Sequence, residues 1–391
     1  MTFVASVGHA QSLDAREASL QAAHHALNQM GNNSPALAII ISPYRFDAQM
    51  ILSGATSLLS NIPILGFSSP AALTHFGYHT NTVVVALLGG DELQAETHWF
   101  AAYSQASSDT ATRLQQLIGY EQRPVKGVLA FADGLNGNAE EFCQALPASL
   151  PIFGGLAAGD AQSNISYQFA GVQSGNGGMA SAFLRGEYKF GVGYGHGWSP
   201  IGNHFRVTRS RGFWLRTLDS RPAADAYASL FGYASREWAL PPLNYTSRLY
   251  PLGFEQLNDQ KMLIRSPLRV EADGSFRMNA ALRDGSDAYL MVGSSADCIA
   301  AVKNAVKQAL IGLDGAKPVF ALVLIDIAWQ MLLQAKPGAE IQAIHEMLGP
   351  ELPIAGGYTI GQIAPARHMD ENPQFLNQHF MIILFGENSG E

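Results

Sequence analysis

The sequence predicts an α/β fold of two lobes, built from repeated strand–helix–strand–glycine-loop–strand units with mixed, largely parallel sheets. The main observation is a phrase that occurs three times, as NIPILGFSSPAA (61–72), SLPIFGGLAAGD (149–160) and ELPIAGGYTIGQ (351–362). Each copy follows an apolar run and a helical stretch, the order of a strand–helix–strand unit. A chain of 391 residues also exceeds the roughly 100–200 residues of one ordinary domain, so we expect two.

The first element of each unit is a continuous apolar run. These runs are ALAIIIS (36–42), GVLAFAD (127–133) and VFALVLID (319–326). Apolar residues without alternation indicate strands that are covered on both faces, which is typical of parallel sheets.

A helix is expected between each apolar run and the phrase that follows it. The helical stretches are DAQMILSGATSLLS (47–60), NAEEFCQAL (138–146) and AEIQAIHEML (339–348). Because parallel neighbouring strands need a crossover connection, these helices support the parallel pairing of each run with its phrase.

A further strand closes each unit. The candidates are TVVVALLG (82–89), GMASAFLRG (178–186) and HFMIILFGE (379–387). Between the second and third units the chain is more polar and rich in β-strand patterns, so it differs from the repeats.

The phrases themselves are interpreted as glycine loops at strand ends, where ligands gather in parallel sheets. The alternative is that the glycines only permit tight turns and close packing. On the first interpretation small and hydroxylated side chains face a ligand, with Asp160 at the mouth of the second loop. The predicted ligand-binding residues are Ser68, Ser69, Gly155, Asp160, His196, Gly357, Tyr358, Thr359 and Gln362.

Two residues outside the repeated phrases, His196 and Asp133, each have two possible interpretations. His196 lies in GYGHGW (193–198), where an imidazole that stabilises the fold is favoured over a pocket residue. Asp133 ends a strand in FADG, where an Asp-Gly turn is favoured over a metal ligand or base. The sequence identifies no metal-binding set.

The composition excludes several classes of function. A net charge of −8 and a pI near 5.8 argue against nucleic acid as a partner. The two cysteines, Cys143 and Cys298, form no CxxC motif, which fits a reducing compartment. No signal peptide or membrane-spanning run is evident, so we expect a cytoplasmic protein. Because only 14% of the residues are charged, we expect an apolar surface covered by a homodimer or a partner.

Enzyme motifs are missing from the sequence. It contains no GxSxG elbow, no GxGxxG and no GxxxxGK[ST], so we expect a protein that is not an enzyme.

Four stretches resemble the FIST family of signal-transduction domains. The longest runs from Gly193 to Gly232 and begins GYGHGWSPIG. The others are FADGLNG (131–137), LIRSPLRVEADGSFRMNAALRDGSDAYLM (263–291) and PIAGGYTIGQIAP (353–365). The resemblance covers about residues 30 to 385 and implies a FIST N-like domain at 28–220 and a FIST C-like domain at 221–385.

The resemblance implies a sensory protein that binds a small molecule and signals to a separate partner, such as a histidine kinase. An alternative that it also implies is a haem-based nitric-oxide sensor. For haem the candidate ligands beside the phrases are His75, His79, His368 and His379, and the missing CxxCH motif excludes covalent attachment. A second alternative is an uncharacterised hydrolase or transferase, with a reactive cluster near Asp160 or His196.

The chain departs from the family pattern at two places. Gln330 stands where the family has the arginine of a Cys-x-x-Arg motif, and Gln362 stands where it has the glutamate of Gly-Glu. Losing one member of a buried ion pair is more costly than replacing both. The sequence therefore predicts that Gln330 and Gln362 touch in the fold.

Overall fold

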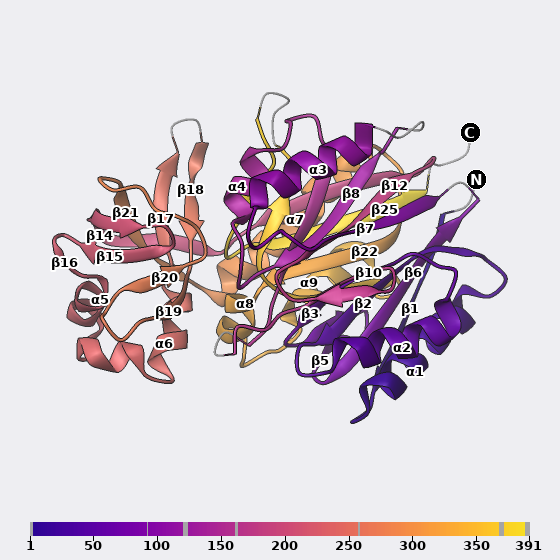
Figure 1. The fold of residues 1–391 in the computed structure, drawn as a ribbon, viewed down its shortest axis with the longest axis horizontal. Coiled ribbons are helices and arrows are strands. Elements are labelled where there is room, and N and C mark those ends of the chain that lie inside the picture. The colour runs from indigo at the N-terminus through magenta and orange to yellow at the C-terminus, as the bar shows by residue number, and fades with distance from the viewer. Residues whose placement is uncertain are drawn as a thin grey trace.

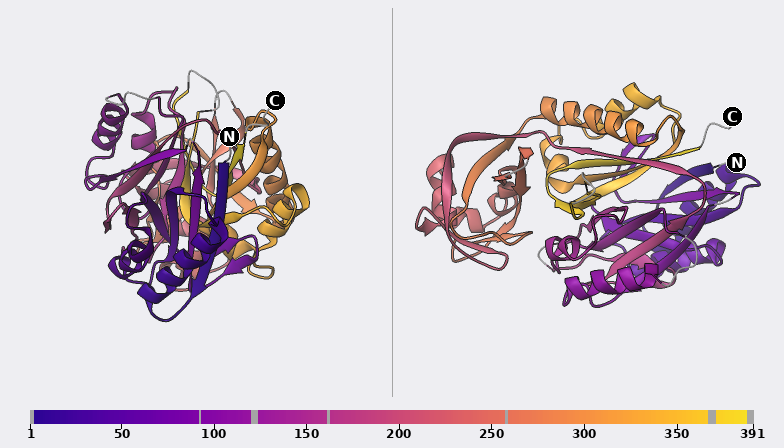
Figure 2. Two further views of the ribbon diagram at one scale, coloured as in Figure 1. Left: turned by 90° about the vertical axis from the view of Figure 1, so that its right-hand side faces the viewer. Right: turned by 90° about the horizontal axis from the view of Figure 1, so that it is seen from above.

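The computed structural model describes residues 3–91, 93–119, 124–160, 163–256, 259–366 and 371–387. It consists of a large body and a smaller lobe beside it (Figure 1). The view from above in Figure 2 shows chain segments that cross between the two parts. The body contains all three repeats, and the lobe is inserted into the third.

The first repeat occupies the N-terminal part of the body. Two strands, each followed by a helix, lead to the strand of the phrase, and a small hairpin and a long strand close the unit. Its elements are β1 (Phe3–Gln11), α1 (Ala15–Met30), β2 (Pro35–Pro43), α2 (Ala48–Leu59), β3 (Ile64–Ser69), β4 (Ala72–Thr74), β5 (Gly77–His79) and β6 (Thr82–Gly90).

The second and third repeats have the same element order. The second contains β7 (Gln94–Phe100), α3 (Ser107–Gly119), β8 (Gly127–Asp133), α4 (Ala139–Gln144), β9 (Ile152–Ala157), β10 (Gln168–Ala170), β11 (Gln173–Gly175) and β12 (Met179–Arg185). The third contains β13 (Lys189–Gly195), α7 (Ser295–Gly312), β22 (Lys317–Asp326), α8 (Ile327–Leu332), α9 (Ala339–Leu348), β23 (Ile354–Ala364), β24 (Gln374–Leu376) and β25 (Phe380–Glu387).

Strand pairing confirms the duplicated unit. The orders β1-β6-β2-β3, β7-β12-β8-β9 and β13-β25-β22-β23 are equivalent, and β2–β3, β8–β9 and β22–β23 are parallel. The α/β class and the mixed sheets are therefore confirmed. Parallel pairing is limited to those three pairs among the described strands, because each closing strand returns antiparallel. The structure also adds a strand and helix to the front of each predicted unit, so the first repeat begins at Phe3, ahead of residue 28.

The three phrases form buried strands, so the predicted glycine loops are wrong. Each strand has a glycine opposite a residue of its parallel neighbour. A Cβ added to Gly66, Gly154 or Gly356 would lie 2.2, 1.9 or 2.4 Å from the carbonyl oxygen of Ile40, Ala130 or Val323. The glycines therefore allow close backbone approach inside a sheet, where a side chain has no room.

The phrase strands converge where the repeats meet. β9 pairs with β23 and joins the second and third repeats in one sheet. β10 of the second repeat pairs with β3 of the first, and β4 of the first pairs with β23 of the third. Each phrase strand therefore contacts another repeat, as the sequence predicts for equivalent parts of a duplicated framework.

The lobe is a curved sheet with short helices, inserted between β13 and α7. Its elements are β14 (Trp198–Arg211), β15 (Trp214–Leu218), β16 (Arg221–Pro222), α5 (Ala223–Phe231), 3-10 helices at 235–239 and 247–249, α6 (Leu243–Thr246), β17 (Leu252–Gln256), β18 (Asp259–Arg265), β19 (Pro267–Val270), β20 (Phe276–Met278) and β21 (Asp287–Gly293). It has a core of its own around Tyr227, Trp238 and Phe276. The predicted domain boundary at 220–221 falls between β15 and β16, within this lobe.

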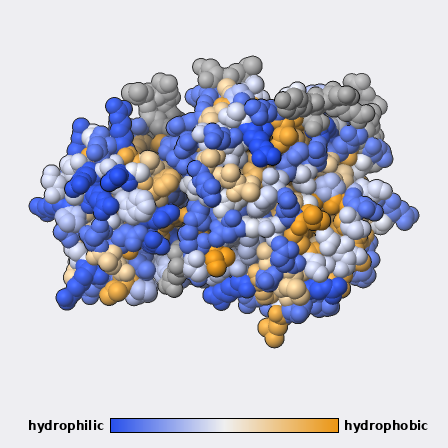
Figure 3. All heavy atoms as spheres, in the orientation of Figure 1, coloured by the Kyte–Doolittle hydropathy of each residue, from blue (hydrophilic) through white to orange (hydrophobic). Residues whose placement is uncertain are grey.

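Exposed apolar residues are scattered over the surface. Leu13, Phe76, Val172 and Ile311 are the most exposed large apolar residues among those described, and they lie far apart in the sequence. On the face shown in Figure 3, orange patches are separated by blue and white atoms. Among the described helices, none is long and apolar enough to cross a membrane.

Candidate functional site

Two short segments connect the lobe to the body, and they lie side by side. The first is Gly195–Trp198, from the last residue of β13 to the first of β14, and the second is Gly293–Ser294, from the last residue of β21 to the residue before α7. Trp198 is opposite Gly293 in the sheet, and the Ser294 N–H donates to the Gly197 carbonyl at 3.2 Å. A Cβ at Gly197 would lie 2.3 Å from the Cys298 nitrogen, so glycine is required for this approach.

A cleft of about 410 Å³ lies at this joint. The first connector, one face of α7, strands of the lobe and the residue before β25 contribute to its walls. Its lining residues are Tyr194, Gly195, His196, Gly197, Trp198, Ser199, Pro200, Met262, Met291, Asp297, Ala300, Ala301, Asn304, Gln308 and His379. The volume is within the usual range for small-molecule pockets, about 300–1,000 Å³.

Two histidines meet in the cleft, with ring centroids 4.9 Å apart in an edge-to-face arrangement. His196 Nδ1 accepts the Trp198 N–H at 3.3 Å, so the neutral ring carries its proton on Nε2. His379 Nδ1 lies 2.6 Å from the Asn377 carbonyl, which only accepts, so its neutral ring carries the proton on Nδ1. The two Nε2 atoms therefore differ: one is a donor and the other an acceptor.

Helix α7 contributes polar side chains to the cleft. Asp297, Asn304 and Gln308 are spaced at seven and four residues, which places them on one helix face. The Asp297 Oδ2 atom accepts the Ser294 hydroxyl at 2.6 Å, and the Gln308 Oε1 atom accepts the Tyr194 N–H at 3.3 Å. Because the Gln308 oxygen is used in this way, its NH2 group is the part of the amide that can donate to a ligand.

A tryptophan pair connects the cleft to the interior. Trp198 lies with its ring centroid 6.0 Å from that of Trp329, and its indole N–H donates to the Leu249 carbonyl at 3.2 Å. The Trp329 indole N–H donates to the Gln378 carbonyl at 2.8 Å. A movement of Trp198 in the cleft is therefore transmitted by direct contact to Trp329 in α8, and from Trp329 to the turn before β25.

A buried aspartate lies behind the tryptophans. Asp326 accepts the Ala328 N–H at Oδ1 and the Gln378 N–H at Oδ2, both at 3.0 Å. Burial raises the pKa of Asp326 to about 6, although these hydrogen bonds and the Arg248 charge partly oppose it. The Gln378 side-chain amide donates to the Arg248 carbonyl and to the Ser266 hydroxyl, so it bonds the body to the lobe.

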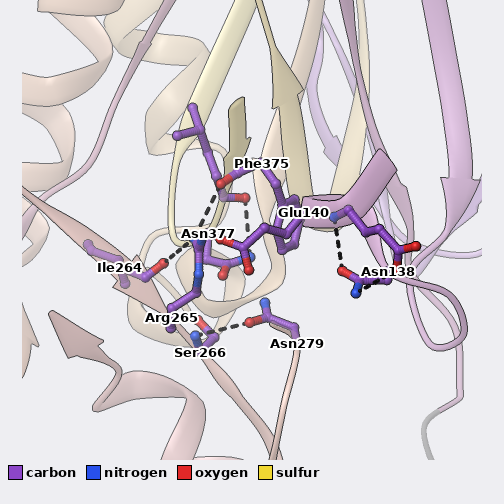
Figure 4. Close-up of polar contacts among 10 residues, drawn as sticks. Asn138, Glu140, Ile264, Arg265, Ser266, Asn279, Phe375 and Asn377 are labelled. Atoms are coloured by element: carbon purple, nitrogen blue, oxygen red, sulfur yellow. Dashed lines mark hydrogen bonds and ion pairs between the residues drawn. The ribbon is translucent and has the colours of Figure 1, made fainter. Parts of the chain in front are cut away.

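A second group of polar contacts holds the lobe against the body (Figure 4). The buried Arg265 of β18 donates to Glu140 of α4 at 2.6 Å and to the Phe375 carbonyl at 3.2 Å. Its guanidinium carbon also lies 5.6 Å from the centroid of the Phe375 ring. One lobe residue thus contacts both the second and the third repeat.

The predicted serines bridge the repeats. The Ser68 hydroxyl donates to the Ala158 carbonyl at 2.7 Å and accepts the Tyr167 N–H at 3.0 Å. The Ser69 hydroxyl donates to the Ala71 carbonyl and accepts the Tyr358 N–H at 2.8 Å. Both hydroxyls are buried and are used between strands, and a ligand role for them stays a prediction.

The predicted residues of the third phrase lie in β23. Thr359 donates to the Ile325 carbonyl at 3.3 Å and accepts the Gln362 amide at 3.0 Å. Tyr358 donates to the buried Glu340 carboxyl at 3.1 Å, and part of it lines a separate pocket beside α8. Gly357 and Gly155 face Ser69 and Thr359 at close range, so they are packing positions between repeats.

The aspartate candidates lie at the second repeat. Asp133 accepts the Leu135 and Asn136 N–H groups at 2.8 and 3.0 Å, which confirms the turn that the sequence favours. Asp160 is half-buried and accepts the Ser163 hydroxyl at 2.8 Å, and its ligand role stays a prediction.

The histidines proposed as haem ligands are dispersed. His379 lines the cleft, and His368 lies outside the described residues. His79 stacks on His9 at 4.9 Å between ring centroids, and His75 packs on Phe76 at 4.0 Å, at the hairpin of the first repeat. In the described part of the chain, no three His, Cys, Asp or Glu side chains are placed to hold a metal ion.

The predicted contact between Gln330 and Gln362 is wrong. The Gln330 amide donates to the Tyr78 hydroxyl at 2.8 Å, whereas the Gln362 amide donates to Thr359. Gln330 lies in α8 and Gln362 lies inside β23, so the two amides have different neighbours and bind different partners. The structure brings only His196, of the predicted site residues, into the cleft.

Sequence reasoning missed Asp297, Asn304, Gln308 and Gln378. A local signal exists for the first three, because they are polar residues that recur on one face of a helix whose buried residues are mainly alanine and valine. No local signal exists for Gln378, since its role depends on residues from the lobe more than 100 positions earlier in the chain.

Family models match nearly the whole chain. The FIST N domain matches residues 36–221, and the FIST C domain matches residues 223–365. An uncharacterized protein of Methanocaldococcus jannaschii is 26% identical over 123 residues, which are 28% of this chain and 23% of that protein. The match thus spans less than a quarter of the relative.

Solved structures with a related arrangement are distant. A chorismatase structure has a TM-score of 0.38 at 11% identity, over 99% of this chain and 100% of that one. A cyanuric acid hydrolase from A. caulinodans has a TM-score of 0.38 at 8% identity, over 100% of both chains. Likeness at this level carries no information about activity.

Proposed function

The chain belongs to the FIST family of signal-transduction sensor proteins, and from this premise we propose that it binds a small molecule in the cleft at the joint. Ligand binding in the cleft then changes the position of the lobe, and a separate protein recognises that position. The observation that carries this proposal is the location of the cleft. Its walls contain the first connector, Asp297 just after the second connector, and side chains from both the lobe and the body.

A ligand in this position contacts both parts at once. Ser199, Met262 and Met291 belong to the lobe, whereas Asn304 and His379 belong to the body. A ligand shifts an equilibrium between two arrangements only by its difference in affinity for them. A tenfold preference supplies about 1.4 kcal/mol, which suffices when the arrangements are nearly balanced.

The signal has a packed route into the body. The contacts run from Trp198 to Trp329 in α8, and from there to Gln378 in the turn before β25. We expect the receiver to be a separate signalling protein, with a histidine kinase as the candidate that the family resemblance implies. A homodimer and a cytoplasmic location belong to the same proposal.

The haem alternative is supported by one observation. The His379 Nδ1–H is held by a backbone carbonyl, which is the usual way to orient a histidine that binds a metal. The rest of the cleft fits a porphyrin poorly, because Asp297, Asn304 and Gln308 line it and the His196 ring lies against that of His379. An absorption spectrum after expression with haem tests this alternative: a Soret band that His379→Ala abolishes would support it.

The hydrolase or transferase alternative is less well supported by the contacts that His196 and Asp160 make in the described part of the chain. His196 uses its lone-pair nitrogen to accept a backbone N–H, so it is not placed as a general base. At Asp160 the hydroxyl that contacts the carboxylate is that of the exposed Ser163. These contacts favour binding over catalysis.

A thermal-stability screen of small metabolites tests the proposed function. A ligand at about 100 times its Kd stabilises the folded protein by about 2.7 kcal/mol. We expect the shift produced by a true ligand to be lost in His196→Ala and Gln308→Ala, and kept in His24→Ala, which changes an exposed residue of α1. A ligand whose shift survives both cleft variants would contradict the proposed site.

A further inference from the structure

The cleft has an uneven charge. Of the side chains that line it in the described structure, Asp297 carries a full charge, and no lysine or arginine is present. The N-terminus of α7 contributes a partial positive charge of roughly half a unit, which the Asp297 carboxylate outweighs. Among the aspartate, glutamate, lysine and arginine side chains of the described structure, the cleft lining therefore carries one negative charge and no positive one.

One oxygen of Asp297 is available to a ligand. Oδ2 accepts the Ser294 hydroxyl, and among the described residues no donor reaches Oδ1. The side chain is exposed at the cleft, so a ligand can approach it without displacing the helix cap. A donor with a positive charge would form the stronger kind of hydrogen bond there.

Aromatic side chains also line the cleft, among them those of His196 and His379. Trp198 and Tyr194 are nearly buried, at 3% and 8% exposed, and the Trp198 indole packs on Gly293. These rings therefore contribute apolar surface to the cleft, and the Asp297 carboxylate sets the sign of the charge that it favours.

We propose that the cleft takes a small organic cation, an amine or a guanidinium. The charged group pairs with Asp297, the apolar stem packs on the aromatic lining, and the amides of Asn304 and Gln308 bind polar atoms along the rest of the ligand. This inference rests on the proposed sensor function and adds the chemical class of the ligand to it.

A matched four-carbon series tests the charge. Putrescine, 1,4-butanediol and succinate have similar length and carry positive, zero and negative charge. We expect binding of putrescine alone, measured by calorimetry and by tryptophan fluorescence. Asp297→Asn should weaken it by about tenfold or more. Asp314→Asn is the control, because Asp314 is an exposed residue just beyond the far end of α7, at a positive φ that asparagine adopts readily.

A second variant separates the ligand contact from the helix cap. Ser294→Ala removes the capping hydroxyl but keeps the Asp297 carboxylate, so we expect it to lower stability and to retain putrescine binding. Equal loss of binding in Ser294→Ala and Asp297→Asn would show that only the cap matters, and would overturn the proposal.

Three further results would also overturn it: equal or tighter binding of butanediol or succinate, an unchanged putrescine affinity in Asp297→Asn, or no putrescine binding up to about 1 mM. These results leave the sensor function testable on its own. A neutral or anionic ligand from the metabolite screen that depends on His196 and Gln308 would refute the cation and keep the sensor.

Discussion

The contact between β13 and α7 gives the most quantitative prediction, because two glycines of β13 lie directly against the helix backbone. A Cβ at Gly193 would lie 1.8 Å from the Ala305 carbonyl oxygen, and real Cβ atoms almost never come within 3.0 Å. A Cβ at Gly195, two residues along on the same face, would lie 3.4 Å from the Ala301 carbonyl oxygen, an ordinary contact. The pair therefore offers a test and its own control.

Gly193→Ala should destabilise the protein by about 3 kcal/mol or more. Overpacking usually costs about 1–3 kcal/mol, and here the obstacle is helix backbone, which has no rotamer to change. Gly195→Ala should be neutral or stabilising by up to about 1 kcal/mol, because alanine loses less entropy than glycine in a strand.

Denaturant unfolding followed by tryptophan fluorescence measures both variants under identical conditions. We expect a clear fall in the midpoint for Gly193→Ala and little change for Gly195→Ala. If Gly193→Ala unfolds within about 1 kcal/mol of the unmodified protein, the close packing of β13 on α7, and with it the frame of the cleft, is refuted.

Three other predictions concern charge. Burial raises the pKa of Asp326 from 3.8 to about 6. The contribution of protonated Asp326 to the free energy of unfolding is therefore complete below pH 3.8 and is lost as the pH rises through about 6. Asp326→Asn should flatten this part of the curve of stability against pH. The pKa values of His9 and His79 are lowered, mainly by burial, so stability should fall as the pH drops below 6.5, and His9→Gln should reduce that fall in thermal melts. Arg265→Ala leaves the partly buried Glu140 unpaired and should cost up to about 3–5 kcal/mol, seen as faster proteolysis of the lobe, whereas Arg265→Lys should be milder.

The repeated framework could be predicted from the sequence because its signals are local. An apolar run, a helix and a Pro-Ile strand within about forty residues define a unit, and β2–β3, β8–β9 and β22–β23 pair as expected. The glycines of the phrases were assigned to loops because a glycine after apolar residues indicates a turn. In the fold they mark strands whose neighbours approach too closely for a side chain, and the sequence does not distinguish the two cases.

The cleft could not be predicted because no local signal connects its parts, although the polar face of α7 is visible in the sequence. His196, Asp297 and His379 are far apart in the sequence. They meet because the lobe is inserted into the third repeat, between β13 and α7. The glycine-rich GYGHGW stretch did indicate close backbone packing around His196. Whether His196 lines a pocket depends on the second connector, and that segment follows the whole lobe in the sequence.

Hydrogen exchange measured with and without a stabilising ligand tests the central claim most directly, because it reports where the ligand binds. We expect protection concentrated at residues 194–200 and in the first half of α7, on both sides of the joint. Protection at β3, β9 and β23 with none at the joint would contradict the account and return the ligand to the repeated phrases.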